Sequence, residues 1–127
     1  MFAGEQFGKA AEAINLYISL FPQSFIKTME YFQAGELGGE EGTVKNAVFT
    51  LSGTEYMAFD SAMGHQFTFT PSMSIFVNCE SEEELDKLFN ELSKEGAVMM
   101  PPDNYGFSEK FAWIADRYGV SWQFNLK

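Results

Sequence analysis

An internal repeat is the feature that most constrains how this chain can fold. Shifting the sequence by 66 residues places one strand–turn–strand segment of the first half on a similar segment of the second half. The matched pairs are Val48 with Ile114, Gly53 with Gly119, Tyr56 with Trp122, and Ala58 with Phe124. In both copies an apolar strand turns through glycine into an aromatic strand, so the sequence predicts two units of the same design.

Hydrophobic periodicity gives the two units the same order of elements. Apolar residues recur at helical spacing in Gly8–Phe21 and in Ser81–Glu95. Glycine, proline and acidic residues mark Gln33–Gly42 and Pro101–Gly106 as loops. Strands are expected at Met1–Ala3, Phe25–Phe32, Thr43–Ser52, Thr54–Phe59, Met73–Cys79, Ala97–Met100, Phe107–Ala115 and Val120–Leu126.

This order predicts an α+β fold built from two βαβββ units. Neither unit can bury a sheet face alone, so we expect them to form one domain over residues 1–127, with units at 1–62 and 63–127. The strands should form a cupped mixed sheet around a central cleft, with the helices on the outside.

Composition excludes several classes of partner. The formal net charge is −10 and only eight residues are Lys or Arg, which argues against binding to nucleic acid or to an anionic membrane surface. The single cysteine, Cys79, cannot form an internal disulfide and is typical of a reducing compartment. No secretory signal is visible, so we expect a cytoplasmic protein.

Three segments resemble a known family. The segments are Ala10–Pro22 (AAEAINLYISLFP), Met73–Glu80 followed by Glu82–Leu85, and above all Asp116–Phe124 (DRYGVSWQF). They are similar to the PhnB-like branch of the vicinal-oxygen-chelate superfamily, which includes glyoxalases, bleomycin resistance proteins and dioxygenases. The resemblance covers nearly the whole chain. It implies the two-unit fold described above and a homodimer.

The superfamily resemblance also implies positions for metal ligands, but this chain has unsuitable residues there. In the superfamily the last hairpin typically reads Asp, two residues and Gly, with a glutamate ligand four positions after the Gly; Asp116 and Gly119 fit this pattern, and the ligand position is Gln123. The related position of the first unit is Met57, and a common histidine position is Ser72. Zinc, nickel and iron prefer imidazole, carboxylate or thiolate donors. We therefore expect no metal and no other cofactor.

The candidate ligand-binding residues are instead polar and aromatic. In Val120–Leu126, strand alternation puts Trp122, Phe124 and Leu126 on one face and Ser121, Gln123 and Asn125 on the other. We expect the polar set to face the cleft. Together with the superfamily positions and the lone histidine, this gives the candidates Gln123, Ser121, Ser72, His65 and Trp113.

Three functions fit these observations. The first is binding of a small organic molecule in an apolar cleft without a complete metal site. The alternative is a metal-dependent enzyme of the glyoxalase or dioxygenase type, and the third is an interaction role. PhnB-like proteins are often described as 3-demethylubiquinone methyltransferases. An adenosine cofactor is usually held by a glycine-rich turn within a βαβ unit. In this chain Gly35, Gly38 and Gly39 lie in an acidic loop with no βαβ unit after them. The residues do not support that chemistry.

Overall fold

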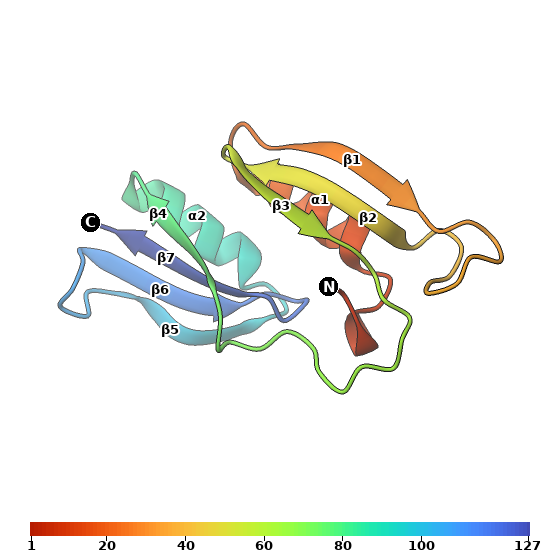
Figure 1. The fold of residues 1–127 in the computed structure, drawn as a ribbon. Helices are drawn as coiled ribbons and strands as arrows, with labels where there is room; N and C mark the ends of the chain where they lie inside the picture. Colours follow the sequence, from red (N-terminus) through yellow and green to blue (C-terminus); the bar gives the residue numbers. More distant parts are fainter. The chain divides into compact units, whose positions relative to one another are not determined.

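The computed structural model describes residues 1–127 and has the predicted α+β fold, with two helices and seven of the eight predicted strands (Figure 1). The chain divides into two compact units, Met1–Thr68 and Phe69–Lys127. This boundary and the predicted one after residue 62 both lie in the segment between the third and fourth strands. Neither helix has the length and apolar character that a membrane-crossing helix requires.

The first unit contains a short 3-10 helix (Gly4–Gln6), α1 (Ala10–Leu20), β1 (Phe25–Tyr31), β2 (Val44–Leu51) and β3 (Thr54–Ala58). Its strands form an antiparallel sheet in the order β1-β2-β3, and α1 packs on this sheet mainly through β2. The helix buries Ala10, Ala13, Ile14 and Tyr17, which recur at helical spacing. The tight turn between β2 and β3 uses positive φ at Ser52 and Gly53, which suits the twist of a two-residue hairpin.

The leading strand expected at Met1–Ala3 is reduced to a single parallel bridge between Phe2 and Asp60. The Phe2 N–H donates to the Phe59 carbonyl at 2.9 Å, and the Ser61 N–H donates to the Phe2 carbonyl at 3.0 Å. The chain cannot continue as a strand because Gly4 adopts a φ of 59° and begins the 3-10 helix. The prediction of a strand here was therefore wrong beyond one residue.

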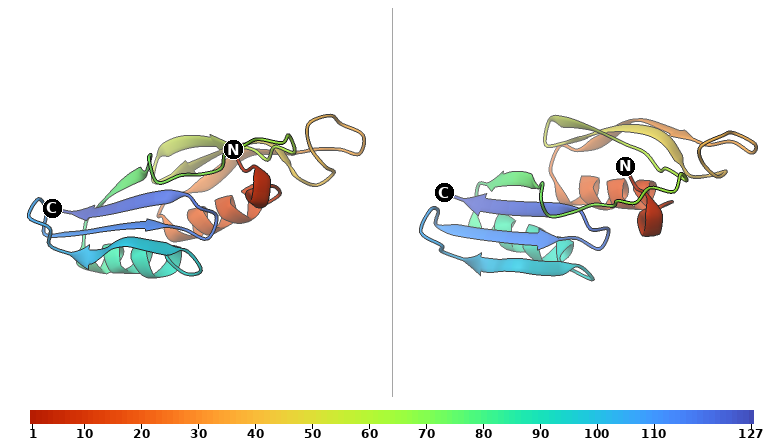
Figure 2. Two further views of the ribbon diagram at one scale, coloured as in Figure 1. Left: turned by 90° about the horizontal axis from the view of Figure 1, so that it is seen from below. Right: turned by 60° about the horizontal axis from the view of Figure 1, so that its bottom comes forward.

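The second unit contains β4 (Ile75–Cys79), α2 (Glu82–Leu92), β5 (Ala97–Asp103), β6 (Lys110–Ala115) and β7 (Ser121–Leu126). The sheet order is β4-β7-β6-β5, with β4 parallel to β7 and the other neighbours antiparallel. Helix α2 lies along one face of this mixed sheet, which Figure 2 shows from two directions. Trp122, Phe124 and Ile114 are completely buried in this unit's core.

Helix α2 begins at a side-chain cap. Ser81 accepts a hydrogen bond from the Glu84 N–H at 3.1 Å, and the Glu84 carboxylate accepts one from the Glu80 N–H at 3.1 Å. The first bond satisfies one of the backbone donors that a helix start leaves without partners, and the second holds the residue before the cap against the first turn. One turn further on, the buried residues Leu85, Leu88 and Leu92 form the face that packs against the sheet.

Replacing the capping serine tests this start. We expect Ser81→Ala to lower the free energy of unfolding by about 1 kcal/mol, because the Glu84 N–H loses its partner. Urea denaturation monitored by circular dichroism measures the change. Ser93→Ala, at the other end of α2, is the control, since the Ser93 side chain has no capping role there. Equal losses in both variants would contradict the assigned cap.

Strand β5 is longer than predicted. It continues through Pro101 and Pro102 to Asp103, whereas the sequence placed a loop from Pro101 onward. Proline has no backbone N–H to donate to a neighbouring strand. It is tolerated in β5 because β5 is an edge strand and pairs only with β6, so one side of its backbone makes no sheet hydrogen bonds. The register against β6 is irregular between Met100 and Asp103, where the prolines interrupt the ladder.

Candidate functional site

The face of the second sheet that points away from α2 carries the candidate site. Strand β7 places Gln123 on this face, and its register neighbours are Phe76 on β4 and Trp113 on β6; Met100 on β5 is the register neighbour of Trp113. Paired residues of neighbouring strands share a face, so these four side chains form one row across the sheet. We call this surface the Gln123 face. It comprises Ser74, Phe76, Asn78, Met100, Phe111, Trp113, Ser121, Gln123 and Asn125.

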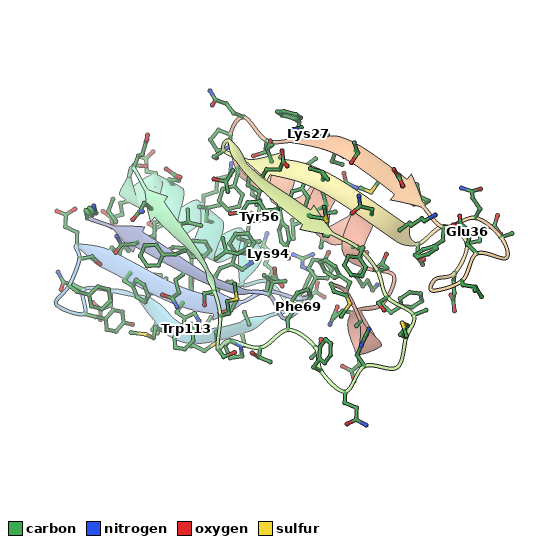
Figure 3. All side chains as sticks on the ribbon, in the orientation of Figure 1. Lys27, Glu36, Tyr56, Phe69, Lys94 and Trp113 are labelled. Atoms are coloured by element: carbon green, nitrogen blue, oxygen red, sulfur yellow. The ribbon has the colours of Figure 1, made fainter.

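Four of these residues form a hydrogen-bonded network. The indole Nε1–H of Trp113, labelled in Figure 3, donates to Ser121 Oγ at 2.8 Å. Ser121 Oγ lies 2.6 Å from Ser74 Oγ, and Gln123 Nε2 donates to Ser74 Oγ at 3.2 Å. The network joins β6, β7 and the residue preceding β4. It therefore fixes the orientation of Trp113 and Gln123 relative to each other.

The number of protons in this network leaves one hydroxyl donor without a partner. One of the two serine hydroxyls must donate to the other, and the remaining hydroxyl keeps its proton for another acceptor. Ser121 is only 3% exposed, whereas Ser74 is half-buried. The distance between the two oxygens does not itself give the direction of this bond. A buried donor without an acceptor is costly, so we assign Ser121 as the donor and the available proton to Ser74.

Apolar and amide side chains surround the network. Phe76 is 54% exposed beside Gln123, while Trp113 and Met100 are half-buried. Asn125 Nδ2 donates to Asn78 Oδ1 at 3.2 Å and forms a second polar pair on the same face.

Three aromatic rings lie where β5 and β6 meet. Phe111 of the Gln123 face contacts Phe107 edge-on, with ring centroids 5.0 Å apart, and Tyr105 at 6.2 Å. The Tyr105 hydroxyl donates to the Pro101 carbonyl at 2.5 Å, which holds the loop against β5. This geometry gives the face a rigid aromatic border.

The Gln123 face carries no positively charged side chain. The nearest ionisable group by register is Asp103, opposite Phe111. Lys110 belongs to the other face: its Nζ donates to Glu82 and Asp86 of α2, each at 2.8 Å. These two carboxylates raise the pKa of Lys110 through hydrogen bonds, the larger effect coming from Asp86. The site itself therefore offers neutral hydrogen-bonding groups and no positive charge.

The structure brings together three of the five predicted site residues: Gln123, Ser121 and Trp113. Ser72 is exposed and its hydroxyl lies 2.6 Å from that of Thr70, outside the network. His65 belongs to the first unit, where Nε2 lies 2.9 Å from Ser61 Oγ. A ligand-binding role for Ser72 or His65 stays a prediction.

Sequence reasoning missed Ser74, which accepts from Gln123. Ser74, Phe76 and Asn78 alternate in sequence along β4, and this period of two was a usable signal. Its link to β7 depends on parallel pairing between distant segments, which no local pattern specifies.

Two buried aspartates have structural roles. Asp60 Oδ1 accepts from the backbone N–H groups of Gly8 and Ala10 at 2.9 and 3.1 Å. Its Oδ2 accepts from the backbone N–H of Val44 at 2.8 Å, so Asp60 links the start of α1 to β2. Asp116 accepts two backbone N–H groups of the β6–β7 turn and the indole N–H of Trp122. In both aspartates these hydrogen bonds hold the carboxylate between backbone segments that are distant from each other or form a turn.

The family described as 3-demethylubiquinone-9 3-methyltransferase matches residues 1–125. The chain is 51% identical to a PhnB protein from Bacillus cereus, with 95% of this chain and 93% of that chain covered and a TM-score of 0.91. The chain belongs to this PhnB-like family. Protein PA1353 from Pseudomonas aeruginosa is 25% identical over 95% of this chain and 91% of that chain, with a TM-score of 0.83. No protein with curated function is a significant match.

The glycines of this PhnB-like chain do not fit the methyltransferase description of its family. Gly35, Gly38 and Gly39 lie between β1 and β2, which pair antiparallel. An adenosine cofactor is typically held by a glycine turn that leads from a parallel strand into a helix. Gly39 is instead covered by the Phe32 ring, which a Cβ at this position would overlap. The loop is therefore shaped for packing against Phe32.

The donor set also does not fit a divalent metal. No three His, Cys, Asp or Glu residues lie close enough together to hold one. At the ligand positions that the superfamily resemblance implies, Gln123 donates to Ser74 through its amide, Ser72 is bonded to Thr70, and Met57 offers only an exposed thioether. Amide, hydroxyl and thioether groups are weak ligands for zinc, nickel or ferrous iron.

Cys79 ends β4 and is buried. Burial, with a smaller contribution from the Glu84 carboxylate, raises the pKa of the Cys79 thiol to about 12. The thiolate is the nucleophilic form, so this group is unreactive near neutral pH.

This leads to a prediction for alkylation. Because the pKa rises from 9.0 to about 12, the thiolate fraction of Cys79 at pH 8 is roughly a thousandth of that of an ordinary thiol. Iodoacetamide should therefore modify the unfolded protein in urea rapidly and the folded protein at least about a hundredfold more slowly. The thiol of the unfolded chain ionises near pH 9.0, whereas that of the folded chain stays protonated up to about pH 12. The contribution of Cys79 to the free energy of unfolding is therefore fully present below pH 9 and is lost as the pH rises toward 12. Mass spectrometry follows the modification, and equal rates would contradict the burial.

Proposed function

We propose that this PhnB-like chain binds a small organic molecule on the Gln123 face. The single observation that carries the proposal is the network of Trp113, Ser121, Ser74 and Gln123, which holds unused hydrogen-bonding capacity beside exposed Phe76. Small-molecule sites combine apolar surface with a few fixed polar groups that orient the ligand. The network and the apolar row give this combination within one unit of the chain.

The proposal does not require catalysis. The alternative, a metal-dependent enzyme of the glyoxalase or dioxygenase type, lacks a donor set of suitable chemistry. Asp116 and Asp60 are occupied by backbone donors, and the Cys79 thiol is protonated at neutral pH. These features favour ligand binding over catalysis. Membership of the vicinal-oxygen-chelate superfamily and a cytoplasmic location stay predictions from the sequence.

Binding can be tested by titrating the ¹⁵N-labelled protein with a library of neutral aromatic fragments. We expect hits to shift the Trp113 indole N–H and the Gln123 side-chain amide resonances. Gln123→Leu should weaken these hits about tenfold, because one or two hydrogen bonds are lost. The matched control is Gln66→Leu, at an exposed glutamine, which should leave the affinity unchanged. A library whose hits all map elsewhere, or that gives no hits, would refute the proposal.

We also propose that the chain forms a homodimer, as the family resemblance implies. In support, the outer edge of β1 has no neighbouring strand, and Phe25 and Tyr31 on this strand are exposed. Light scattering on a sizing column should then give about twice the chain mass of 14.3 kDa at micromolar concentration. Phe25→Ser combined with Tyr31→Ser should shift the mass toward the monomer if β1 takes part. A wild-type mass near that of one chain would exclude the dimer.

A further inference from the structure

We infer that the ligand of the Gln123 face is a flat, uncharged aromatic molecule whose edge carries a carbonyl group next to an N–H, as in an aromatic lactam. This inference rests on the proposed function and specifies its ligand. It follows from three properties of the face: the hydrogen-bonding groups that the network leaves available, the side chains beside them, and the absence of positive charge.

The available groups are one donor and one acceptor side by side. Ser74 accepts from Gln123 Nε2 and, with Ser121 assigned as the donor of the serine pair, from Ser121 as well; the Ser74 hydroxyl proton is then free to donate. The Gln123 Oε1 atom belongs to the same amide as Nε2 and takes no part in the network, so it is free to accept. A ligand carbonyl can receive the Ser74 proton while a neighbouring ligand N–H donates to Gln123 Oε1. Adjacent carbonyl and N–H groups are the edge of a cyclic amide.

The neighbouring side chains favour a flat ring. Phe76 and Trp113 lie on either side of Gln123 in the same row, and Met100 continues the row beyond Trp113. The hydrogen bond from Trp113 Nε1 to Ser121 fixes the indole ring before a ligand arrives, which lowers the ordering cost of binding. Aromatic rings and thioethers make favourable contacts with planar aromatic molecules.

Charge excludes an anionic ligand. No Lys, Arg or His lies on the Gln123 face, and the nearest ionisable group in register is the carboxylate of Asp103. The whole chain has a formal net charge of −10. A ligand carboxylate would lose part of its hydration without gaining a cation, and it would be repelled by the protein.

Four probes of similar size separate these requirements. Isoquinolin-1(2H)-one has the carbonyl and the N–H, its 2-methyl derivative lacks the N–H, naphthalene lacks both, and 1-naphthoate is an anion. We expect the lactam to bind most tightly, the N-methyl compound and naphthalene about tenfold or more weaker, and the naphthoate weakest. Chemical shifts of the Trp113 indole N–H and the Gln123 amide give both the location and the dissociation constant of each complex.

Two variants connect the affinities to the assigned groups. Ser74→Ala should weaken lactam binding about tenfold and leave naphthalene binding unchanged, because only the lactam uses the hydroxyl proton. Ser93→Ala is the matched control, since this serine ends α2, which packs on the opposite face of the sheet. A stability measurement shows whether Ser74→Ala remains folded; if it does not, Ser74→Thr, which keeps the hydroxyl, should retain the lactam preference.

The two proposals fail in different ways. If naphthalene or the naphthoate shifts the Gln123 face with an affinity equal to that of the lactam, the face binds ligands but the inference about their chemistry is wrong. If none of the four probes and none of the library fragments shifts these resonances, the proposed function itself is wrong.

Discussion

Asp116→Ala should lower the free energy of unfolding by roughly 3–5 kcal/mol, because it leaves several buried donors without an acceptor. The Asp116 side chain is 3% exposed, and its Oδ1 accepts from the backbone N–H groups of Tyr118 and Val120 at 2.9 and 3.0 Å. Its Oδ2 accepts from Trp122 Nε1 at 2.9 Å. Water cannot replace these bonds where Trp122 is completely buried.

Urea denaturation of the variant and the wild type measures this loss. Asp103→Ala is the control: it removes an exposed carboxylate whose one hydrogen bond is to the neighbouring Asn104 N–H, and it should cost about 0.5 kcal/mol or less. In a Trp122→Phe background, Asp116→Ala should cost less than in the wild type, because one of the three donors is already gone. A loss at Asp116 no larger than that at Asp103 would contradict the assigned role.

The same carboxylate matters for the candidate site. Asp116 closes the turn between β6, which carries Trp113, and β7, which carries Ser121 and Gln123. The Trp113–Ser121 hydrogen bond depends on the register of these two strands. A destabilised turn should therefore also weaken fragment binding, even though Asp116 does not belong to the Gln123 face.

Most of the fold could be predicted from the sequence because its signals are local. The leucines of α2 recur at helical spacing, and β7 alternates strictly between polar and apolar residues. The prediction for β5 was wrong because Pro101 and Pro102 usually interrupt strands, and only the sheet order shows that β5 lies at an edge where proline is tolerated.

The candidate site was predicted where it depends on one hairpin and missed where it depends on distant pairing. Ser121 and Gln123 share a face by alternation alone, and Trp113 lies opposite Gln123 across the β6–β7 hairpin. Ser74 reaches the network through the parallel alignment of β4 with β7, some 47 residues apart along the chain. The superfamily resemblance pointed to Ser72 instead, two residues away, because it carried over the position of a metal ligand.

Gly96→Ala should lower the free energy of unfolding about as much as Asp116→Ala, because the added Cβ would collide with the backbone. Gly96 connects α2 to β5, and a Cβ built on it would overlap the Ala115 carbonyl oxygen and approach the backbone of Asp116. Ala97 and Ala115 are paired in the sheet, so the first residues of β5 and the last of β6 cannot separate without breaking the ladder. We expect a loss of at least about 3 kcal/mol in the free energy of unfolding, more than side-chain overpacking usually costs.

Gly64→Ala provides the matched control for this change. A Cβ at Gly64 meets no atom within 4 Å, so this substitution should alter the free energy of unfolding by less than about 1 kcal/mol. Because Met100 and Trp113 are paired further along the same two strands, a displaced β5 should also shift the Trp113 indole N–H resonance in Gly96→Ala but not in Gly64→Ala. If both variants have the same stability and leave that resonance unchanged, β5 can move away from β6 freely. The row of side chains on the Gln123 face would then not be rigid enough to orient a ligand.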